Sequence, residues 1–172
     1  MFNFVRLLLC QLASHLLAYP VVVTLVGSCR LMIKHCMVGE TCNHYFGLRE
    51  FKEIGFLLHF LRQDELFIEI GANVGSCTVL AAAVGQARVV AVEPTSSTFL
   101  PLLDKADVNA FGHLVRAFYI GIGASEGRLH FFVKLGAENH VVFVQPGQSL
   151  QAMEVQVNAL DDLLPVERPV LI

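Results

Sequence analysis

Charged side chains are scarce in this chain of 172 residues, since Lys, Arg, Asp and Glu make up only 16% of it. The formal net charge is −3, so the sequence offers no basic field that would attract a nucleic-acid backbone. The hydrophobic share is 55%, which excludes a disordered chain and is ample for a buried core. We therefore expect no nucleic-acid partner and one folded domain with an appendage.

Disulfide and zinc motifs are missing as well. The five cysteines are an odd number and include no Cys-x-x-Cys pair, which argues against a disulfide framework. Cys29, His35, Cys36, Cys42 and His44 lie near one another in the sequence, but their spacing matches no common zinc pattern. We interpret them as reduced thiols and neighbouring histidines, predict no metal site, and expect a reducing, cytoplasmic compartment.

The N-terminal region lacks charge from Leu7 to Cys29, and the first acid in the chain is Glu40. An uncharged stretch of this length can cross a bilayer, although polar residues and Pro20 dilute its apolar character. The preferred interpretation is a buried helical cap, so that residues 1–46 form an apolar helical segment. A membrane anchor or membrane-contacting hairpin at residues 7–29 is the second interpretation. A cleaved signal peptide is the third, although its apolar core would normally be shorter.

After residue 47, short apolar runs alternate with helical patterns, and this order predicts an α/β domain with a buried, mostly parallel sheet. The expected strands are 66–70, 88–92 and 117–122, and the expected helices are 48–61, 76–84 and about 95–109, with Pro101 near the first turn of the last. A β-rich region follows, with strands at 128–133, 140–144 and 153–158, a helical turn at 161–164, and a further buried strand that begins at Val170.

The most informative segment is a glycine-bounded turn between the first two of these strands. Glu69 stands at the end of one strand, Gly71 and Gly75 bound the turn, and Glu93 ends the next strand. Parallel strands end at the same edge of a sheet, so both carboxylates should lie beside a bare stretch of backbone. α/β proteins bind nucleoside-bearing cofactors at such an edge.

The residues in and around the turn have chemistry suited to such a ligand. Glycine lets a ligand touch the backbone, and the unpaired N–H groups at the start of the next helix favour an anion. Glu93 can accept two hydrogen bonds from a ribose diol, each worth about 1.5–3 kcal/mol. Asn73 stands where the dinucleotide fingerprint has glycine, and Glu69 can face a cation. Both departures favour S-adenosylmethionine over a dinucleotide.

Two segments, Glu69-Ile70-Gly71-Ala72-Asn73-Val74-Gly75 and Val90-Ala91-Val92-Glu93-Pro94, resemble the FkbM-type family of class I S-adenosylmethionine-dependent methyltransferases. The resemblance covers roughly residues 48–172, with looser similarity at Asn109, 121–127 and 160–163. It implies a Rossmann-like fold and S-adenosylmethionine as the methyl donor. The expected reaction is O-methylation of a sugar or small-molecule hydroxyl.

The same resemblance implies roles for particular residues. The methionine end of the cofactor would lie against Glu69 and the loop residues Gly71, Ala72, Asn73 and Gly75. Glu93 would hold the ribose, and Gly123 and Ala124 would flank the adenine.

One departure from the family pattern concerns the strand that begins at Val170. In the family an acidic segment, Lys-Ile-Asp-x-Glu-Gly, follows this strand, whereas here the sequence ends at Ile172. We therefore expect residues 47–172 to form a methyltransferase domain with an incomplete sheet, lacking its C-terminal strands and most of the acceptor side. No catalytic base is identified. The alternatives are a catalytically inactive binding or interaction domain and a dinucleotide-dependent oxidoreductase.

Overall fold

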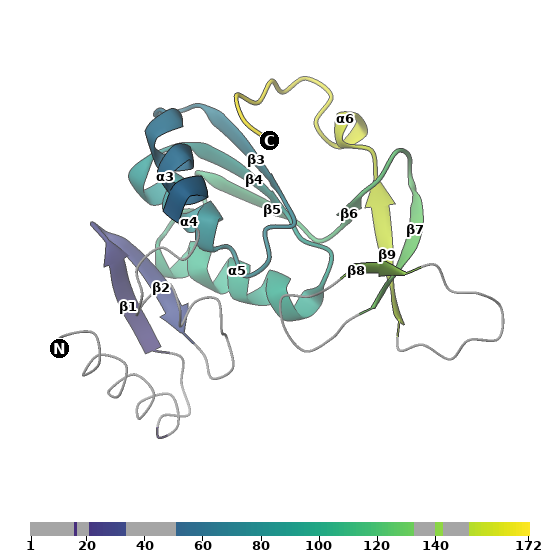
Figure 1. Cartoon of the computed structure of the whole chain (residues 1–172), viewed down its shortest axis with the longest axis horizontal. Coiled ribbons are helices and arrows are strands. Elements are labelled where there is room, and N and C mark those ends of the chain that lie inside the picture. The colour runs from purple at the N-terminus through teal and green to yellow at the C-terminus, as the bar shows by residue number, and fades with distance from the viewer. Residues whose placement is uncertain (1–15, 17–20, 34–50, 133–139, 143–151) are drawn as a thin grey trace.

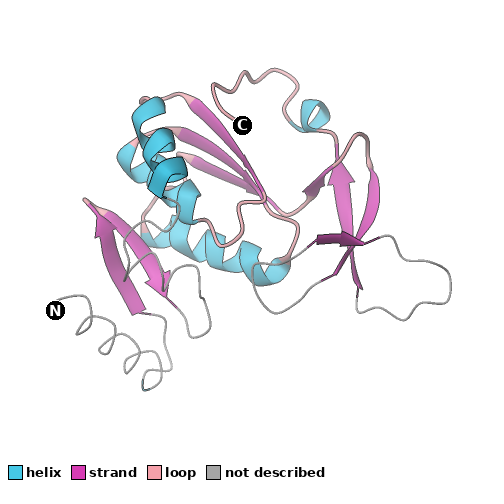
Figure 2. Ribbon diagram, in the orientation of Figure 1, coloured by secondary structure: helices cyan, strands magenta, loops and turns pink. Residues whose placement is uncertain are grey.

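A three-stranded parallel sheet forms the centre of the protein (Figures 1 and 2). The computed structural model describes residues 16, 21–33, 51–132, 140–142 and 152–172. The strands β3 (Leu66–Ile70), β4 (Arg88–Val92) and β5 (Val115–Phe118) are neighbours in that order. Helix α4 (Ser76–Val84) connects β3 to β4, and α5 (Ser96–Val108) connects β4 to β5. This arrangement confirms the predicted α/β, Rossmann-like fold with a parallel sheet.

Helices cover one face of this sheet. Helix α3 (Phe51–Phe60) precedes β3 and lies beside α4, as the amphipathic pattern of residues 48–61 predicts. Phe67, Val89 and Val115 are register neighbours across the three strands and are buried under the helices. The alanines of α4, Ala81 and Ala82, pack against them, and their small side chains let the helix lie close to the sheet. Full burial of one such valine or phenylalanine contributes roughly 1.5–3 kcal/mol.

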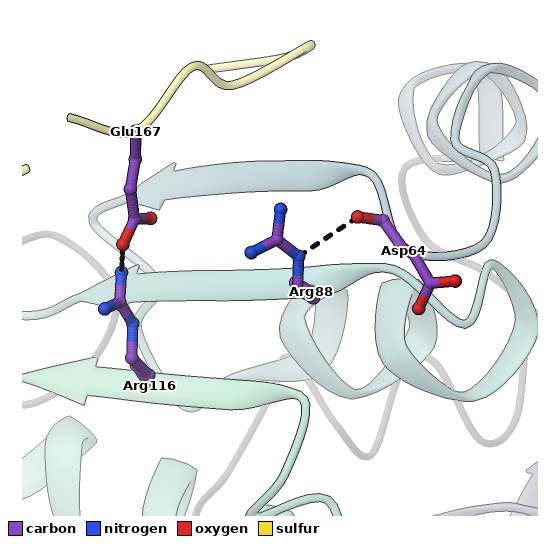
Figure 3. A network of polar contacts seen from close by, with 4 residues as sticks. All are labelled: Asp64, Arg88, Arg116 and Glu167. Atoms are coloured by element: carbon purple, nitrogen blue, oxygen red, sulfur yellow. Dashed lines mark hydrogen bonds and ion pairs between the residues drawn. The ribbon is translucent and has the colours of Figure 1, made fainter.

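The C-terminal segment covers the opposite face of the sheet. Helix α6 (Leu160–Leu163) packs with Leu164 against Ile68 and Val90, whose side chains alternate with those on the helical face. The same segment reaches the sheet through Glu167, whose Oε1 accepts a 2.6 Å hydrogen bond from Arg116, while the nearby Arg88 donates to the carbonyl of Asp64 (Figure 3). The Arg116 side chain is 53% exposed, so this ion pair contributes little stability.

The end of the chain pairs with the free edge of β3. Leu171 forms a parallel bridge with Phe67 and accepts a 3.0 Å hydrogen bond from the Ile68 N–H, and the Val170 N–H donates to Leu66. The order across the sheet is therefore Leu171, β3, β4, β5. β3, the first strand of this sheet in the sequence, is therefore not at its edge. From β3 the chain adds β4 and β5 on one side, and it later returns to place Leu171 on the other side of β3. In open α/β sheets, ligands bind at such a switch point.

A second sheet lies beyond β5. It contains β6 (Gly121–Ile122), β9 (Ala152–Asn158), β7 (Gly127–Phe132) and β8 (His140–Val142) in that order. The prediction of one strand over residues 117–122 is wrong, because the chain changes sheets within it. Gly121 permits this change, since a Cβ at that position would lie only 2.8 Å from Val157 Cγ1. Backbone and side chain therefore approach closely where β6 meets β9.

The predicted helix of residues 1–46 is also wrong for the part that is described between 21 and 33. Strands β1 (Val21–Val26) and β2 (Cys29–Ile33) form an antiparallel hairpin with Gly27 in the left-handed region at φ +55°. The β-branched run of β1 favours a strand over a helix. Most of the uncharged stretch at 7–29 and its flanks lies outside the described residues. Within the described part of the chain, no helix has the length and apolar character needed to cross a membrane.

Helix α5 begins where the sequence predicts, but its proline lies further from the N-terminus of the helix than predicted. Thr95 is the N-cap residue and Asn109 the C-cap residue, close to the predicted limits. Pro101 lies in the second turn, not the first. A proline there removes one backbone hydrogen bond of the helix, and the residue itself is buried.

Candidate cofactor-binding site

The loop between β3 and α4 has an unusual backbone. Gly71, Asn73 and Gly75 all have left-handed φ values, of +78°, +51° and +78°. Glycine adopts this conformation freely, and asparagine is among the few other residues that tolerate it. A Cβ on Gly75 would also lie 2.8 Å from Leu102 Cγ, so this position requires glycine for two reasons. The N–H groups of Gly71 and Ala72 donate to the Val92 carbonyl at 2.9 and 3.0 Å and tie the loop to the end of β4.

Glu93 lies beside this loop, as the sequence predicts, and is only 5% exposed. Its Oε2 accepts a 2.9 Å hydrogen bond from the Asn73 N–H. Its Oε1 accepts from the Thr95 N–H at 3.0 Å and from the hydroxyls of Thr95 and Thr98. The carboxylate therefore joins the loop to the start of α5. Oε2, with a single donor, keeps a lone pair for a ligand, whereas Oε1 is fully used within the protein.

Glu69 lies at the end of β3 with its half-buried side chain turned toward α4. Its Oε2 accepts a 2.5 Å hydrogen bond from the hydroxyl of Thr78, which is completely buried. Burial raises the pKa of Glu69 from 4.5 to about 7, and the negative charge of Glu93 adds a smaller rise. Hydrogen bonds from Thr78 lower the pKa but do not offset the burial. Glu69 therefore changes its charge near neutral pH.

A cavity of about 540 Å³ opens between α3 and the edge of β3, at the switch point of the sheet. Its lining is mostly apolar, with Glu69 as the acid contributed by the sheet. The lining residues are Lys52, Glu53, Phe56, Leu57, Phe67, Ile68, Glu69, Ile70, Leu171 and Ile172. An apolar pocket with a few polar groups is the usual form of a small-molecule site.

The end of the loop and the start of α4 supply backbone donors. The N–H groups of Val74 and Ser76 have no hydrogen-bond partner among the residues that the structure describes. Groups of this kind at a helix N-terminus attract an anion such as a carboxylate.

Two aromatic side chains that contact each other follow the ends of β4 and β5 in the sequence. The Glu93 N–H donates to the Phe118 carbonyl at 3.1 Å, which places the end of β5 beside the Glu93 backbone. Tyr119 follows, and its half-exposed ring contacts Phe99 of α5 at a centroid distance of 5.3 Å. Gly123, by contrast, follows β6 and donates its N–H to the Asn158 carbonyl of β9 in the second sheet, with Ala124 beyond it.

Sequence reasoning brought Glu69, Gly71, Ala72, Asn73, Gly75 and Glu93 together correctly at one edge, but it missed the residues that support them. Thr78 holds Glu69, Thr95 and Thr98 hold Glu93, and the buried Lys105 donates to the Val74 carbonyl. A signal was present, since 95, 98 and 105 follow helical spacing and share one face with Leu102. A lysine in a helix normally indicates a solvated face, so this stripe was not recognised.

The described residues contain no group of three or more side chains able to hold a metal ion. Of the five cysteines and histidines considered above, only Cys29 falls among them. It is completely buried, and burial raises its pKa to about 11. The other four residues lie outside the described part, so the prediction of no metal site there stays a prediction.

No family model matches the chain, and no curated protein matches it significantly. Among solved structures, Pyrococcus horikoshii TYW2 in complex with MeSAdo is 20% identical with a TM-score of 0.48, over 59% of this chain and 36% of that one. A SAM-dependent methyltransferase from Agrobacterium tumefaciens is 13% identical with a TM-score of 0.46, over 60% and 33%.

A third similar structure is the geranyl diphosphate C-methyltransferase of Streptomyces coelicolor A3(2), in complex with Mg²⁺, geranyl diphosphate and S-adenosyl-L-homocysteine. It is 18% identical with a TM-score of 0.39, over 48% of this chain and 32% of that one. The chain thus spans only about a third of the length of the structures it matches. Similarities of this size do not assign a function, which has to be argued from the residues at the sheet edge.

Proposed function

We propose that this chain carries the donor site of an S-adenosylmethionine-dependent methyltransferase. The observation that carries the proposal is the meeting of three features at one switch point: the half-buried acid Glu69, the left-handed loop from Gly71 to Gly75, and the buried acid Glu93. A nucleoside with a cationic tail is the ligand that uses all three. A dinucleotide would place a pyrophosphate, not a cation, near Glu69.

The proposed placement follows the chemistry of each end of the cofactor. The amino-acid end lies in the cavity beside α3, where Glu69 faces its ammonium group and the N–H groups of Val74 and Ser76 face its carboxylate. The ribose donates one hydrogen bond to Glu93 Oε2, because Oε1 is already used. Phe99 and Tyr119 provide an aromatic surface for the adenine. The earlier expectation for Gly123 and Ala124 is the less supported placement, since Gly123 is bound to β9.

The protein's task in methyl transfer from a sulfonium is mainly to position the two reactants for an in-line displacement. The bound cofactor supplies the electrophilic methyl group. Glu69 and the loop orient it from one side, and the apolar lining of the cavity lies beside it. The acceptor in the proposal is a hydroxyl group of a sugar or another small molecule, as the family resemblance suggests.

Calorimetric titration with S-adenosylmethionine, S-adenosylhomocysteine and NAD tests this proposal. We expect saturable binding of the first two and none of NAD. Glu93→Ala should weaken S-adenosylhomocysteine binding by about tenfold or more, because a hydrogen bond to a charged group is lost and the loop loses its anchor. Glu154→Gln, which changes an exposed acid in the second sheet, is the matched control and should leave the affinity unchanged.

Three outcomes would contradict the proposal. Binding of NAD alone would favour the oxidoreductase alternative. Equal binding of S-adenosylhomocysteine by wild type and Glu93→Ala would remove the role of Glu93. Absence of binding by a well-folded sample would favour an interaction domain without catalysis.

A further inference from the structure

Lys105 is the most deeply buried cationic side chain among the residues that the structure describes, with no exposed surface. Its Nζ donates a 2.5 Å hydrogen bond to the carbonyl oxygen of Val74. Because Lys105 lies in the interior, the Val74 carbonyl must point inward, away from the open side of the loop. A carbonyl on the open side would repel the carboxylate of a ligand, whereas its inward direction leaves N–H groups to face it.

Lys105 is part of a stripe along one face of α5 that controls three successive loop residues. Thr95 and Thr98 hold the Glu93 carboxylate, which accepts the Asn73 N–H. Leu102 fills the space that a side chain at position 75 would need. Lys105 holds Val74, the residue between Asn73 and Gly75, by donating a hydrogen bond to its carbonyl oxygen. The conformation of the loop is therefore set by α5 and not by the loop sequence alone.

We propose that Lys105 is a positioning residue for the cofactor loop: by holding the Val74 carbonyl in the interior, it keeps the loop in the conformation that binds the cofactor. This inference rests on the proposed function for its effect on affinity, but its effect on the loop itself does not. The backbone of Asn73 is in the left-handed region, which is unfavourable for a residue with a side chain. Without support from α5, the loop would readily adopt another conformation. If only a fraction of molecules has the competent loop, the apparent affinity falls by that fraction.

The test compares Lys105→Met with Lys105→Gln. Both replacements have the same length and both remove the amine, but only glutamine keeps an N–H donor. Val115→Ala is the control, because it opens the core under β5 without touching the loop. Two quantities are measured: S-adenosylhomocysteine affinity by calorimetry, and hydrogen exchange of the Asn73 and Gly75 amides in the free protein. The Val90 amide in β4 serves as the internal reference.

In Lys105→Met we expect the affinity to fall by about tenfold or more, the value of a hydrogen bond to a charged group. The Asn73 and Gly75 amides should exchange at least about tenfold faster, while Val90 stays protected. Lys105→Gln should recover part of both effects. Val115→Ala should lower the melting temperature and leave both the affinity and the two loop amides as in wild type.

Unchanged exchange of the loop amides in folded Lys105→Met would overturn the proposal. Equal loop exchange in Lys105→Met and Val115→Ala would also overturn it, since the effect would then be general destabilisation. If Lys105→Met does not fold, Lys105→Gln decides the question by the same two measurements. Failure of wild type to bind S-adenosylhomocysteine would refute the proposed function, and the exchange experiment would still decide whether Lys105 positions the loop.

Discussion

The raised pKa of Glu69 makes a definite prediction about stability: Glu69→Gln should stabilise the free protein, and more so as the pH rises. The unfolded chain binds a proton at this residue with a pKa of 4.5, and the folded protein with a pKa of about 7. Between these values the folded state holds more protons than the unfolded state. The free energy of unfolding therefore falls as the pH rises through this window, and it is constant above it.

The size of the effect follows from the difference between the two pKa values. Each pKa unit corresponds to about 1.4 kcal/mol, so a rise from 4.5 to about 7 corresponds to at most about 3.5 kcal/mol. The side chain is half-buried, and screening by solvent reduces this figure. Part of the loss has already occurred at pH 5. We expect the advantage of Glu69→Gln over wild type to grow by about 2 kcal/mol between pH 5 and pH 8.

Urea unfolding of both proteins at several pH values from 5 to 8 measures this difference. Titrating groups that do not interact with Glu69 affect both proteins alike, so the difference between the two curves reports on Glu69 and its coupling to Glu93. Glu53→Gln, at an exposed acid of α3 that borders the same cavity, is the matched control. A constant difference between Glu69→Gln and wild type over the whole range would refute the account of Glu69 as an acid whose ionisation is opposed by burial.

Three further predictions concern single positions. Gly75→Ala should lower the free energy of unfolding by about 1–3 kcal/mol in urea titrations, because the new Cβ would clash with Leu102 and the backbone there is left-handed. Gly112→Ala, which has open space around it, is the control and should change the free energy of unfolding little. Glu93→Gln should lower the free energy of unfolding by about 1–3 kcal/mol in the same assay, because the amide NH₂ would face the N–H of either Asn73 or Thr95, and two donors cannot bond to each other. Unchanged stability would contradict the hydrogen-bond assignment. Cys29 should resist iodoacetamide at pH 8 in the folded protein, because its pKa of about 11 leaves very little thiolate. Mass spectrometry measures the labelling, and rapid labelling would show that the hairpin does not cover Cys29.

The sequence was sufficient for the centre of the fold because the signals there are local. Buried parallel strands appear as short apolar runs, and β3 and β4 have the predicted limits. The hairpin at residues 21–33 was misread because length and lack of charge outweighed its β-branched composition. The break between β5 and β6 was missed because it depends on Val157, which is distant in sequence.

The same distinction applies to the candidate site. Glu69, the loop and Glu93 have a recognisable spacing, so their meeting at one edge followed from the direction of parallel strands. The contacts that hold them come from side chains that look ordinary in sequence. A threonine in α4 and a lysine in α5 acquire their roles only because the helices pack with those faces inward. The cavity could not be predicted, since it depends on where α3 lies against the edge of β3.

The pH dependence of the free protein and that of its proposed complex should have opposite signs, and this follows from Glu69 alone. Ionisation of Glu69 destabilises the free protein because burial opposes the charge. A cation bound beside it would favour the ionised form, and linkage then requires that binding lower the pKa of Glu69 and release a proton. Affinity for S-adenosylmethionine should therefore gain more between pH 6 and pH 8 in wild type than in Glu69→Gln, since the titration of the ligand's own amino group is common to both. The carboxylate expected to weaken the empty fold is thus the group that would face the cation of the proposed ligand.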